Sequence, residues 1–433
     1  MITDTASARE SQGAAARTAP AAAGPDSGPG QGSESRGRGH RPKDSAQLTV
    51  RRLTSRDAIA ALVPEWRALY ESGAALNPYA SPDWIVPWLQ HFTAEHELAL
   101  VAVRRSERLI GVAPCFVRGV GGVLRTVQLA GTVRSPGLTE LPQVLAAPGE
   151  TRSVQRAVIG HWLEQPGRWD WLELPLSADQ GWFEPQWLGE GARFRGLVQH
   201  RMTRAAVVLP LPQNTYPDRI PHLLKRNVWE SVKRSRNRLG RDGRPWRVTV
   251  HSDTAQVAAA LPVLRRLHAA RAGAAGKRTH PDVLADRARY AFVADAVVRM
   301  AAAGRAEVLT LDVAGEPIAA LLVLRAPAAA YFALSGLDPA WWRAGPVTLL
   351  QFEAIERAAA RGDREVNLSV GPDLSKLRWS EQVVQHPDFV VCGPRPRSRR
   401  RLAAYSALAS IAAVRREAAR HRVLAGKSTV PNT

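Results

Sequence analysis

The chain has 433 residues, of which 45% are hydrophobic and 13 are tryptophans, so it has enough apolar material for more than one core. Its formal net charge is +20, and only six of the 59 basic residues are lysines. Such a surface attracts phosphates, nucleic acid or anionic lipid, although an Ala- and Arg-rich composition also contributes to it. Two distant cysteines, Cys115 and Cys392, exclude a disulfide framework and a cysteine-rich metal site. There is no apolar signal segment and no run of 18 apolar residues, so we expect a cytoplasmic protein.

The first 47 residues differ in composition from the rest of the chain. After Ile2 they contain no Leu, Val, Ile, Phe, Tyr or Trp, which predicts a disordered arm. Apolar periodicity begins at Leu48. It predicts, in order, a strand at 48–53, a helix at 58–71, strands at 98–103 and 109–116 in a hairpin, a strand at 123–130, a helix at 152–163 and a strand at 169–174.

After Pro210 the same order of elements returns. The pattern predicts a helix at 257–271, strands at 307–313 and 318–324 in a hairpin, a strand at 329–334, a helix at 347–361 and a strand at 365–370. A duplicated unit accounts for this recurrence. We therefore expect an α/β fold of the mixed-sheet (α+β) kind in two tandem domains, 48–210 and 211–393, between the disordered arm 1–47 and a basic amphipathic tail 394–433.

Four short motifs carry a resemblance to a known family. They are a basic helix at 223–241, Leu267-His268-Ala269-Ala270-Arg271, Pro346-Val347-Thr348-Leu349-Leu350, and the set Gly371, Lys376 and Trp379. In this order they resemble the GNAT acyltransferases of the cellulose-biosynthesis CelD-type branch, which is distantly similar to the Fem-type aminoacyltransferases. The resemblance covers roughly residues 48–393. It implies two GNAT-like domains, the second of which transfers an acyl group from acetyl-CoA or another acyl-CoA.

The resemblance implies a cofactor site at the start of the helix near Pro346. In this family the pyrophosphate of acyl-CoA binds at a helix N-terminus, where unpaired N–H groups and the helix dipole favour an anion. Gly345 would allow close approach of the backbone, Thr348 lies in the first turn, and Arg343 would pair with a phosphate or remain a solvated loop arginine. Val347 stands where the family usually has Gly and adds bulk.

The resemblance also places His268 and Arg271 beside an acceptor cleft. His268 would take a proton from an attacking amine, because its ordinary pKa is near neutrality. The alternative is a hydrogen-bonded core histidine on the apolar stripe of its helix. Arg271 would hold an acceptor carboxylate or phosphate, or would seal a contact between the domains.

Three further residues complete the expected site. Tyr331 lies in the strand where a GNAT bulge presents backbone amides to the thioester carbonyl. Lys376 follows the strand that ends at Gly371 and would lie near the acyl group or the phosphates, or on the surface. Trp379 would border the substrate or pack in the core. The sequence predicts no metal, and Ser375 stands where the family usually has Tyr.

The basic tail leaves other functions open. From Arg395 onward, apolar residues recur at helical spacing among arginines. This pattern is typical of a helix on anionic membrane or nucleic acid, or of a helix packed on the second domain. We expect a small-molecule or envelope-precursor acceptor with an amine or hydroxyl. The alternatives are a noncatalytic GNAT pair that binds nucleic acid or membrane, and a Fem-like transferase that uses aminoacyl-tRNA.

Overall fold

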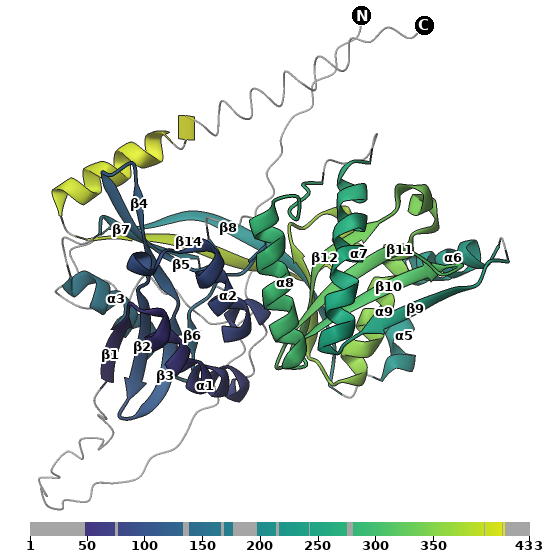
Figure 1. Cartoon of the computed structure of the whole chain (residues 1–433), viewed down its shortest axis with the longest axis horizontal. Coiled ribbons are helices and arrows are strands. Elements are labelled where there is room, and N and C mark those ends of the chain that lie inside the picture. Colours follow the sequence, from purple (N-terminus) through teal and green to yellow (C-terminus); the bar gives the residue numbers. More distant parts are fainter. Residues whose placement is uncertain are drawn as a thin grey trace, which may run out of the picture. The chain divides into compact units, whose positions relative to one another are not determined.

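Two successive sets of helices and strands make up the part of the chain that the computed structural model describes (Figure 1). The described residues are 48–73, 77–132, 138–165, 169–175, 197–213, 216–241, 243–274, 280–393, 395–408 and 410–411. The described residues belong to one compact unit by their contacts. The predicted disordered arm and the end of the basic tail lie outside the described residues.

The first half, residues 48–210, has most of the elements that the sequence predicts. They are β1 (Leu48–Leu53), α1 (Arg56–Ser72), α2 (Pro82–Phe92), β2 (Leu100–Arg105), β3 (Arg108–Ala113), β4 (Cys115–Val120), β5 (Leu124–Leu129), β6 (Leu145–Ala146), α3 (Thr151–Glu164), β7 (Trp171–Pro175) and β8 (Leu197–Pro210). Ser55 fixes the start of α1, because its hydroxyl accepts a hydrogen bond from the amide of Ala58 at 3.2 Å. The predicted strand at 109–116 is interrupted at Pro114, which has no N–H for a ladder, and becomes β3 and β4 in different sheets.

The second half, residues 211–393, repeats this order. Its elements are α5 (Ile220–Leu223), α6 (Arg226–Gly240), β9 (Trp246–His251), α7 (Thr254–Ala272), α8 (Arg287–Ala302), β10 (Ala306–Val313), β11 (Glu316–Ala326), β12 (Ala329–Leu337), α9 (Pro346–Ala360), β13 (Glu365–Val370), α10 (Leu374–Leu377) and β14 (Val383–Cys392). Asp253 caps α7 by accepting from the amide of Gln256 at 2.8 Å. The duplication that the sequence predicts is confirmed, while α2, α8, β8 and β14 are additions to it.

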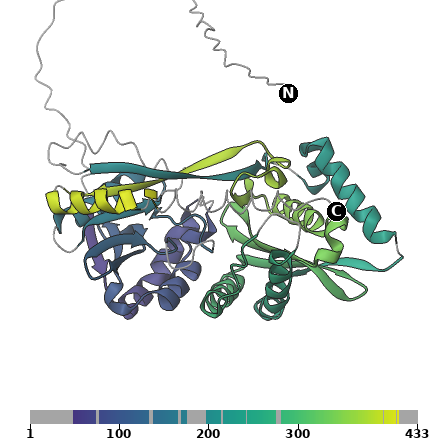
Figure 2. The same cartoon turned by 90° about the horizontal axis from the view of Figure 1, so that it is seen from above.

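Helices cover both faces of the sheet in the second half (Figures 1 and 2). Alternate residues of β12 point to opposite faces, as pleating requires. Tyr331 belongs to the apolar cluster that includes α7 and α8, whereas Ala330 and Phe332 belong to the cluster that includes α6 and α9. The two faces of β12 therefore meet different helices.

The last strand of each half pairs with the other half. Ten strands form one sheet in the order β4-β5-β7-β14-β8-β13-β12-β11-β10-β9, and β1-β2-β3-β6 form a second sheet. β8 is the last strand of the first half but pairs antiparallel with β13, and β14 is the last strand of the second half but pairs antiparallel with β7. β8 and β14 also pair with each other, as Figure 1 shows. The division at residue 210 therefore describes the duplication of the chain, and the strand pairing crosses it.

The helix of residues 396–408 packs where β7 and β14 pair. Leu402 clusters with Trp171 of β7 and with Val390 and Cys392 of β14, the ring of Tyr405 lies against Trp171, and Arg401 forms an ion pair with Asp170 at 2.8 Å. The helix therefore meets the expected second domain only at β14, and the first half supplies its ion pair. The reason is the strand exchange, because β14 carries the chain across to β7 before the helix begins.

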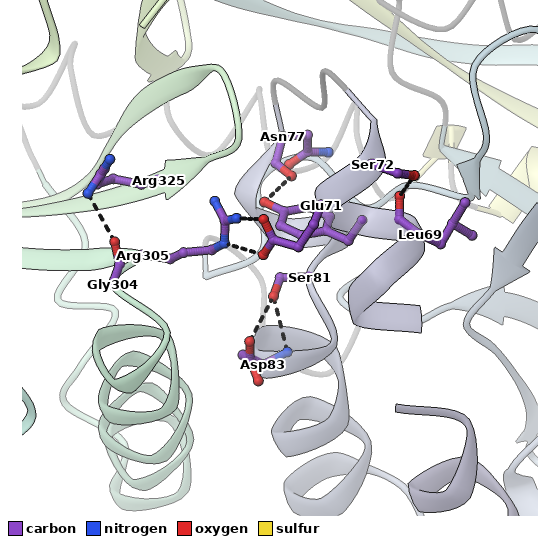
Figure 3. A network of polar contacts seen from close by, with 10 residues as sticks. Leu69, Glu71, Ser72, Asn77, Ser81, Asp83, Gly304, Arg305 and Arg325 are labelled. Atoms are coloured by element: carbon purple, nitrogen blue, oxygen red, sulfur yellow. Dashed lines mark hydrogen bonds and ion pairs between the residues drawn. The ribbon is translucent and has the colours of Figure 1, made fainter. Parts of the chain in front are cut away.

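A polar contact between the halves lies at the end of α1 (Figure 3). Arg305, between α8 and β10, donates from Nε to Glu71 of α1 at 2.9 Å and from Nη2 to the other carboxylate oxygen. Its guanidinium also lies over the ring of Tyr70, 5.3 Å from the centroid. This contact is formed by both oxygens of one carboxylate, a geometry that arginine favours.

Candidate functional site

The strands β12 and β13 separate shortly after they begin. They are parallel neighbours from Ala329 opposite Glu365 to Tyr331 opposite Asn367, and their register includes no later residue of either strand. A bulge in β12 falls at Ala333, because Phe332 lies opposite Val323 while Leu334 lies opposite Leu322. The separation and the bulge leave backbone N–H and C=O groups of β12 outside the regular hydrogen-bond ladder. Such groups can form hydrogen bonds to a ligand.

The helix α9 connects these two strands and begins beside the gap. Gly345 precedes it with φ of 68°, a left-handed conformation that favours glycine, and a Cβ there would lie 2.8 Å from the hydroxyl of Ser235. Gly345 offers no side-chain cap to the first turn of the helix. The helix dipole and the first-turn amides therefore favour an anion at this end.

The basic helix α6 lies beside the start of α9. Its Arg238 donates to the main-chain oxygen of Arg343 at 2.5 Å, and both arginines are exposed. Ser235 lies within hydrogen-bond distance of the oxygen of Gly345, at 3.4 Å. The predicted residues Arg343 and Gly345 thus lie together with Arg238, which the motif comparison did not single out.

The side chains of Val347 and Thr348 both contact other parts of the protein at the start of α9. Val347 is half-buried and packs against the apolar cluster of α6 and α9, so its bulk is accommodated by protein. The hydroxyl of Thr348 accepts from Arg378 at 2.6 Å. The Nε of Arg378 is buried and has no hydrogen-bond partner among the described residues, and burial lowers the pKa of this guanidinium. Arg378 is a further cation beside the first turn of α9.

His268 is a buried residue of the α7 packing surface. Only 1% of it is exposed, its Nδ1 lies 2.9 Å from the oxygen of Ser335, and its Nε2 accepts from the amide of Val283 at 3.4 Å. Both ring nitrogens are therefore engaged by main-chain groups. This geometry matches the hydrogen-bonded core histidine that we weighed against a catalytic base.

Arg271 lies one turn further along α7. Its Nη1 donates to the hydroxyl of Ser335 at 2.5 Å, while its Nε is buried and has no hydrogen-bond partner among the described residues. Burial lowers the pKa of this guanidinium, and Asp373 acts in the opposite direction. His280 stacks edge-on against His268 at 5.1 Å, and burial together with Arg271, His268 and Lys376 lowers its pKa to about 4. His280 is therefore neutral near pH 7.

A carboxylate from the first half enters this region of the second. Glu140 accepts hydrogen bonds from the hydroxyl of Tyr331 at 2.5 Å, the hydroxyl of Ser369 at 2.8 Å and the amide of Val370 at 3.1 Å. Burial raises the pKa of Glu140, and its three donors and Lys376 act against that rise. Arg204 of β8 also donates to the main-chain oxygen of Glu140, at 2.8 Å. Glu140 thus joins Tyr331 of β12 to the end of β13.

Lys376 completes this polar cluster. Its ammonium donates to the oxygen of Val370 and lies 3.4 Å from the hydroxyl of Ser369. Ser369 has φ of 78°, an uncommon conformation for a residue with a side chain, and such strain tends to occur at functional sites. Lys376 and Tyr331 are thus both brought to Glu140, although Tyr331 itself is fully buried.

Gly371 and Trp379 flank the cluster differently. Gly371 is exposed with φ of 86°, and its amide donates to Ala205 of β8 at 2.8 Å. Trp379 is 2% exposed and belongs to the apolar cluster of α6 and α9, which places its side chain in the core. Of the two alternatives for Trp379, the structure favours core packing.

The motifs did not lead to Glu140, although its place in the sequence gives one signal. Glu140 is the one charged residue in the uncharged segment Leu138-Thr139-Glu140-Leu141, and a charge that is partly buried needs partners. The partners of its carboxylate are 191 or more positions away in the sequence, so a local pattern could not locate them. Within the described ranges, no group of three metal-ligating side chains lies close enough to hold a metal ion. None of the described helices is both long and apolar enough to cross a membrane.

Comparison with known proteins agrees with this geometry. Residues 226–377, which include the separated strands, the bulge and the start of α9, match the family model described as "Acetyltransferase (GNAT) domain". The match agrees with the GNAT domain that the sequence predicts for the second half.

The solved structure of FemX extends the likeness beyond the second half. The crystal structure of FemX has a TM-score of 0.55 and 11% identity, covering 78% of this chain and 97% of that one, and it supports the fold of both halves. The C-terminal domain (DUF2156) of a putative lysylphosphatidylglycerol synthetase from Agrobacterium fabrum has a TM-score of 0.48 and 12% identity, over 82% of this chain and 96% of that one. A tandem GNAT protein from the clavulanic acid biosynthesis pathway has 0.40 and 16%, over 81% and 99%. No curated protein matches the sequence significantly.

Proposed function

We propose that the second half, residues 211–393, transfers an acyl group from acyl-CoA to an amine or hydroxyl of a small acceptor. The observation that carries this proposal is the gap between β12 and β13 with the left-handed Gly345 beside it. The family match over residues 226–377 supports the same reaction class.

The residues around α9 fit the phosphates of acyl-CoA. The close contact that a Cβ at position 345 would make shows that the turn is built for a bare backbone. Arg238, Arg343 and Arg378 supply positive charge around the first turn. These groups would hold the pyrophosphate as charge-assisted hydrogen-bond donors.

The chemistry requires no covalent enzyme intermediate. Acyl-CoA supplies an activated thioester, and the protein must hold the acceptor, take its proton and stabilise the oxyanion. The backbone at the Ala333 bulge is the candidate for oxyanion stabilisation, since sheet pairing is irregular there. Because His268 is engaged on both nitrogens, the proton acceptor must come from another residue of the cluster.

A titration of the full chain with acetyl-CoA tests the proposal. We expect calorimetric binding of acetyl-CoA and much weaker binding of acetyl-pantetheine, which lacks the pyrophosphate and the nucleotide. Equal affinity for acetyl-CoA and acetyl-pantetheine would show that α9 does not bind the pyrophosphate. Absence of heat with acetyl-CoA at any accessible concentration would sink the assignment of acyl-CoA.

A second candidate donor rests on α6. This helix, which lies beside the start of α9, carries four exposed basic residues: Arg226, Lys233, Arg234 and Arg238. Such a basic surface would suit an acyl group carried by RNA. A filter-binding series with aminoacylated and deacylated tRNA distinguishes the two donors. Tight binding that favours the aminoacylated form, with no acetyl-CoA affinity, would select the RNA donor. A noncatalytic basic protein would instead bind both forms alike and fall steeply with salt.

A further inference from the structure

The two faces of β12 separate the donor from the rest of the site. The start of α9 and its arginines lie on the face of Phe332, whereas Tyr331 points to the opposite face, towards α7 and α8. Glu140 is bound to Tyr331, and Arg271 and His268 belong to α7, so all three lie on the second face. An acceptor would therefore enter from the α7 side, opposite the donor phosphates.

The carboxylate of Glu140 retains room for one more hydrogen bond. A carboxylate has about four lone-pair sites on its two oxygens. Its Oε2 accepts from Tyr331 and Val370, whereas its Oε1 accepts from Ser369 alone among the residues that the structure describes. No ion pair within 4.0 Å involves this carboxylate among the described residues, and Glu140 is partly exposed. The open position on Oε1 suits a donor with positive charge.

The opposite side of the same cluster has excess positive charge. Arg271 lacks a carboxylate partner within ion-pair distance in the described part of the chain, and its Nε points to no acceptor. Asp373, the acid that raises the pKa of Arg271 against the effect of burial, caps α10 by accepting from the amides of Ser375 and Lys376, at 2.9 and 3.3 Å. A half-buried guanidinium in this state favours binding of an anion, which a carboxylate matches in shape.

The two charges lie near the ends of neighbouring strands. Glu140 accepts from Ser369 near the end of β13, and the hydroxyl of Ser369 lies 3.4 Å from the ammonium of Lys376. Arg271 donates to Ser335 near the end of β12, and the ring of His280 lies 5.1 Å from that of His268 on the same helix as Arg271. The carboxylate of Glu140 and the guanidinium of Arg271 thus both border the region where β12 and β13 separate.

We propose that this region binds an acceptor that carries an amine and a carboxylate close together, as a free amino acid does. This inference rests on the proposed acyl transfer. Arg271 pairs with the acceptor carboxylate, and Oε1 of Glu140 takes one proton from the acceptor ammonium. The amine nitrogen then forms a bond to the acyl carbon while the carbon–sulfur bond breaks. The second proton leaves the nitrogen for the departing thiolate, giving an amide and a free thiol, and Glu140 returns its proton to solvent.

The test measures thiol release from acetyl-CoA by the full chain with three pooled probes. They are the L-amino acids other than lysine, aspartate, glutamate and cysteine, their α-carboxamides, which keep the amine and lose the carboxylate, and their Nα-acetyl derivatives, which lose the amine. We expect the amino-acid pool to be used at least about 10-fold faster than the carboxamide pool, and no use of the N-acetyl pool. Similar rates with amino acids and carboxamides would overturn the proposal, as would no reaction with any pool while acetyl-CoA binds.

Two variants assign the residues. Arg271→Gln should remove the preference for amino acids over carboxamides. Glu140→Gln should lower kcat about 100-fold with little change in KM, and Glu140→Asp should restore part of the rate. Both should bind acetyl-CoA as the parent does, because they lie on the other face of β12. A rate unaffected by Glu140→Gln, or a preference that persists in Arg271→Gln, would contradict the assignment. If the parent protein does not bind acetyl-CoA, the proposed acyl-CoA reaction itself is rejected.

Discussion

The two halves build the same parallel strand pair and connecting helix, but they begin that helix differently. In the first half, β5 and β7 are parallel neighbours joined by α3, and α3 is preceded by Glu150, which accepts from Arg105 at 2.9 and 2.8 Å. In the second half, α9 is preceded by Gly345 and lies beside the arginines of α6. An acid at a helix start repels a phosphate where glycine and arginine would admit one. The two halves share a topology, but only the start of α9 has the residues that suit a phosphate, while Glu150 stands at the start of α3.

The gaps between the parallel strands differ in the same sense. In the first half, Gln128 of β5 donates a hydrogen bond to Glu173 of β7 at 2.9 Å. Arg401 and Ser398 both donate to the carboxylate of Asp170, just before β7. In the second half, Glu140 from the first half lies beside the gap between β12 and β13 and accepts from Tyr331. In the first half, side chains of that half and of the C-terminal helix thus pair with the polar groups of β5 and β7, whereas the gap of the second half receives a carboxylate from the first half. Four changes test how far this contrast determines binding and stability.

The largest effect should follow from giving α9 the acid that α3 has. Gly345→Asp introduces a negative charge and a Cβ that would lie 2.8 Å from Ser235, at φ of 68°. We expect acetyl-CoA affinity to fall at least about 100-fold, or about 2.7 kcal/mol, by calorimetry. The matched control is Gly362→Asp, at the other end of α9, where φ is 77° and no atom lies within 4 Å of the added Cβ. Unchanged affinity in Gly345→Asp would mean that the phosphates bind elsewhere.

The next effect concerns the helix of residues 396–408. Arg401→Ala leaves the carboxylate of Asp170, 6% exposed, without its ion-pair partner. We expect a loss of about 2 kcal/mol in the free energy of unfolding, measured with urea, because an unpaired buried charge is costly. Arg400→Ala, at an exposed neighbouring position, should change stability much less. If the two variants are equally stable, the helix does not contribute to the first half in this way.

A smaller effect should follow from reversing the charges beside α9. Arg343→Glu and Arg238→Glu should each weaken acetyl-CoA binding about 10-fold at low salt and less at high salt, because exposed charges are screened. Arg287→Glu is the control, since Arg287 is also exposed but begins α8. Equal losses in all three variants would show only a general effect of net charge.

The smallest effect should come from the first half's own helix start. Hydrogen bonds from Arg105 lower the pKa of Glu150, so the ionised form stabilises the fold. The advantage over Glu150→Gln should be about 0.5–1 kcal/mol at pH 7, since the pair is partly exposed. It should disappear as pH falls through the lowered pKa of Glu150, because the carboxylate is then protonated in both folded and unfolded chains.

Urea unfolding at a series of pH values measures this difference, with the exposed Glu316→Gln as control. Acetyl-CoA affinity should not change in Glu150→Gln. A change would show that the first half takes part in donor binding.

Periodicity predicted most elements because it reports burial along a single element. The helices at 58–71 and 347–361 and the hairpin at 307–324 are confirmed by α1, α9 and the β10–β11 pair. α2 was missed because apolar side chains surround it and because Pro82 and Pro87 interrupt the pattern of helix formers. β14 was missed because Gln385, His386 and Pro387 break its alternation.

The site was less predictable because its groups come from distant segments. The motifs led to Arg271, Gly345 and Lys376, which the structure places around the gap between β12 and β13. His268 has the spacing of a site residue, yet its two ring nitrogens bond to the main chain. Glu140 belongs to no motif, and only the fold shows that it reaches Tyr331.

The reciprocal pairing of β8 and β14 has a consequence for the order of events during synthesis. As the ribosome releases the first half, β7 has β5 beside it but no neighbour on its other edge until residues 383–392 have emerged. An exposed strand edge is prone to pair with other chains. The first half therefore cannot mature before the second, and a chain divided at residue 210 would leave each fragment without a strand of its own sheet.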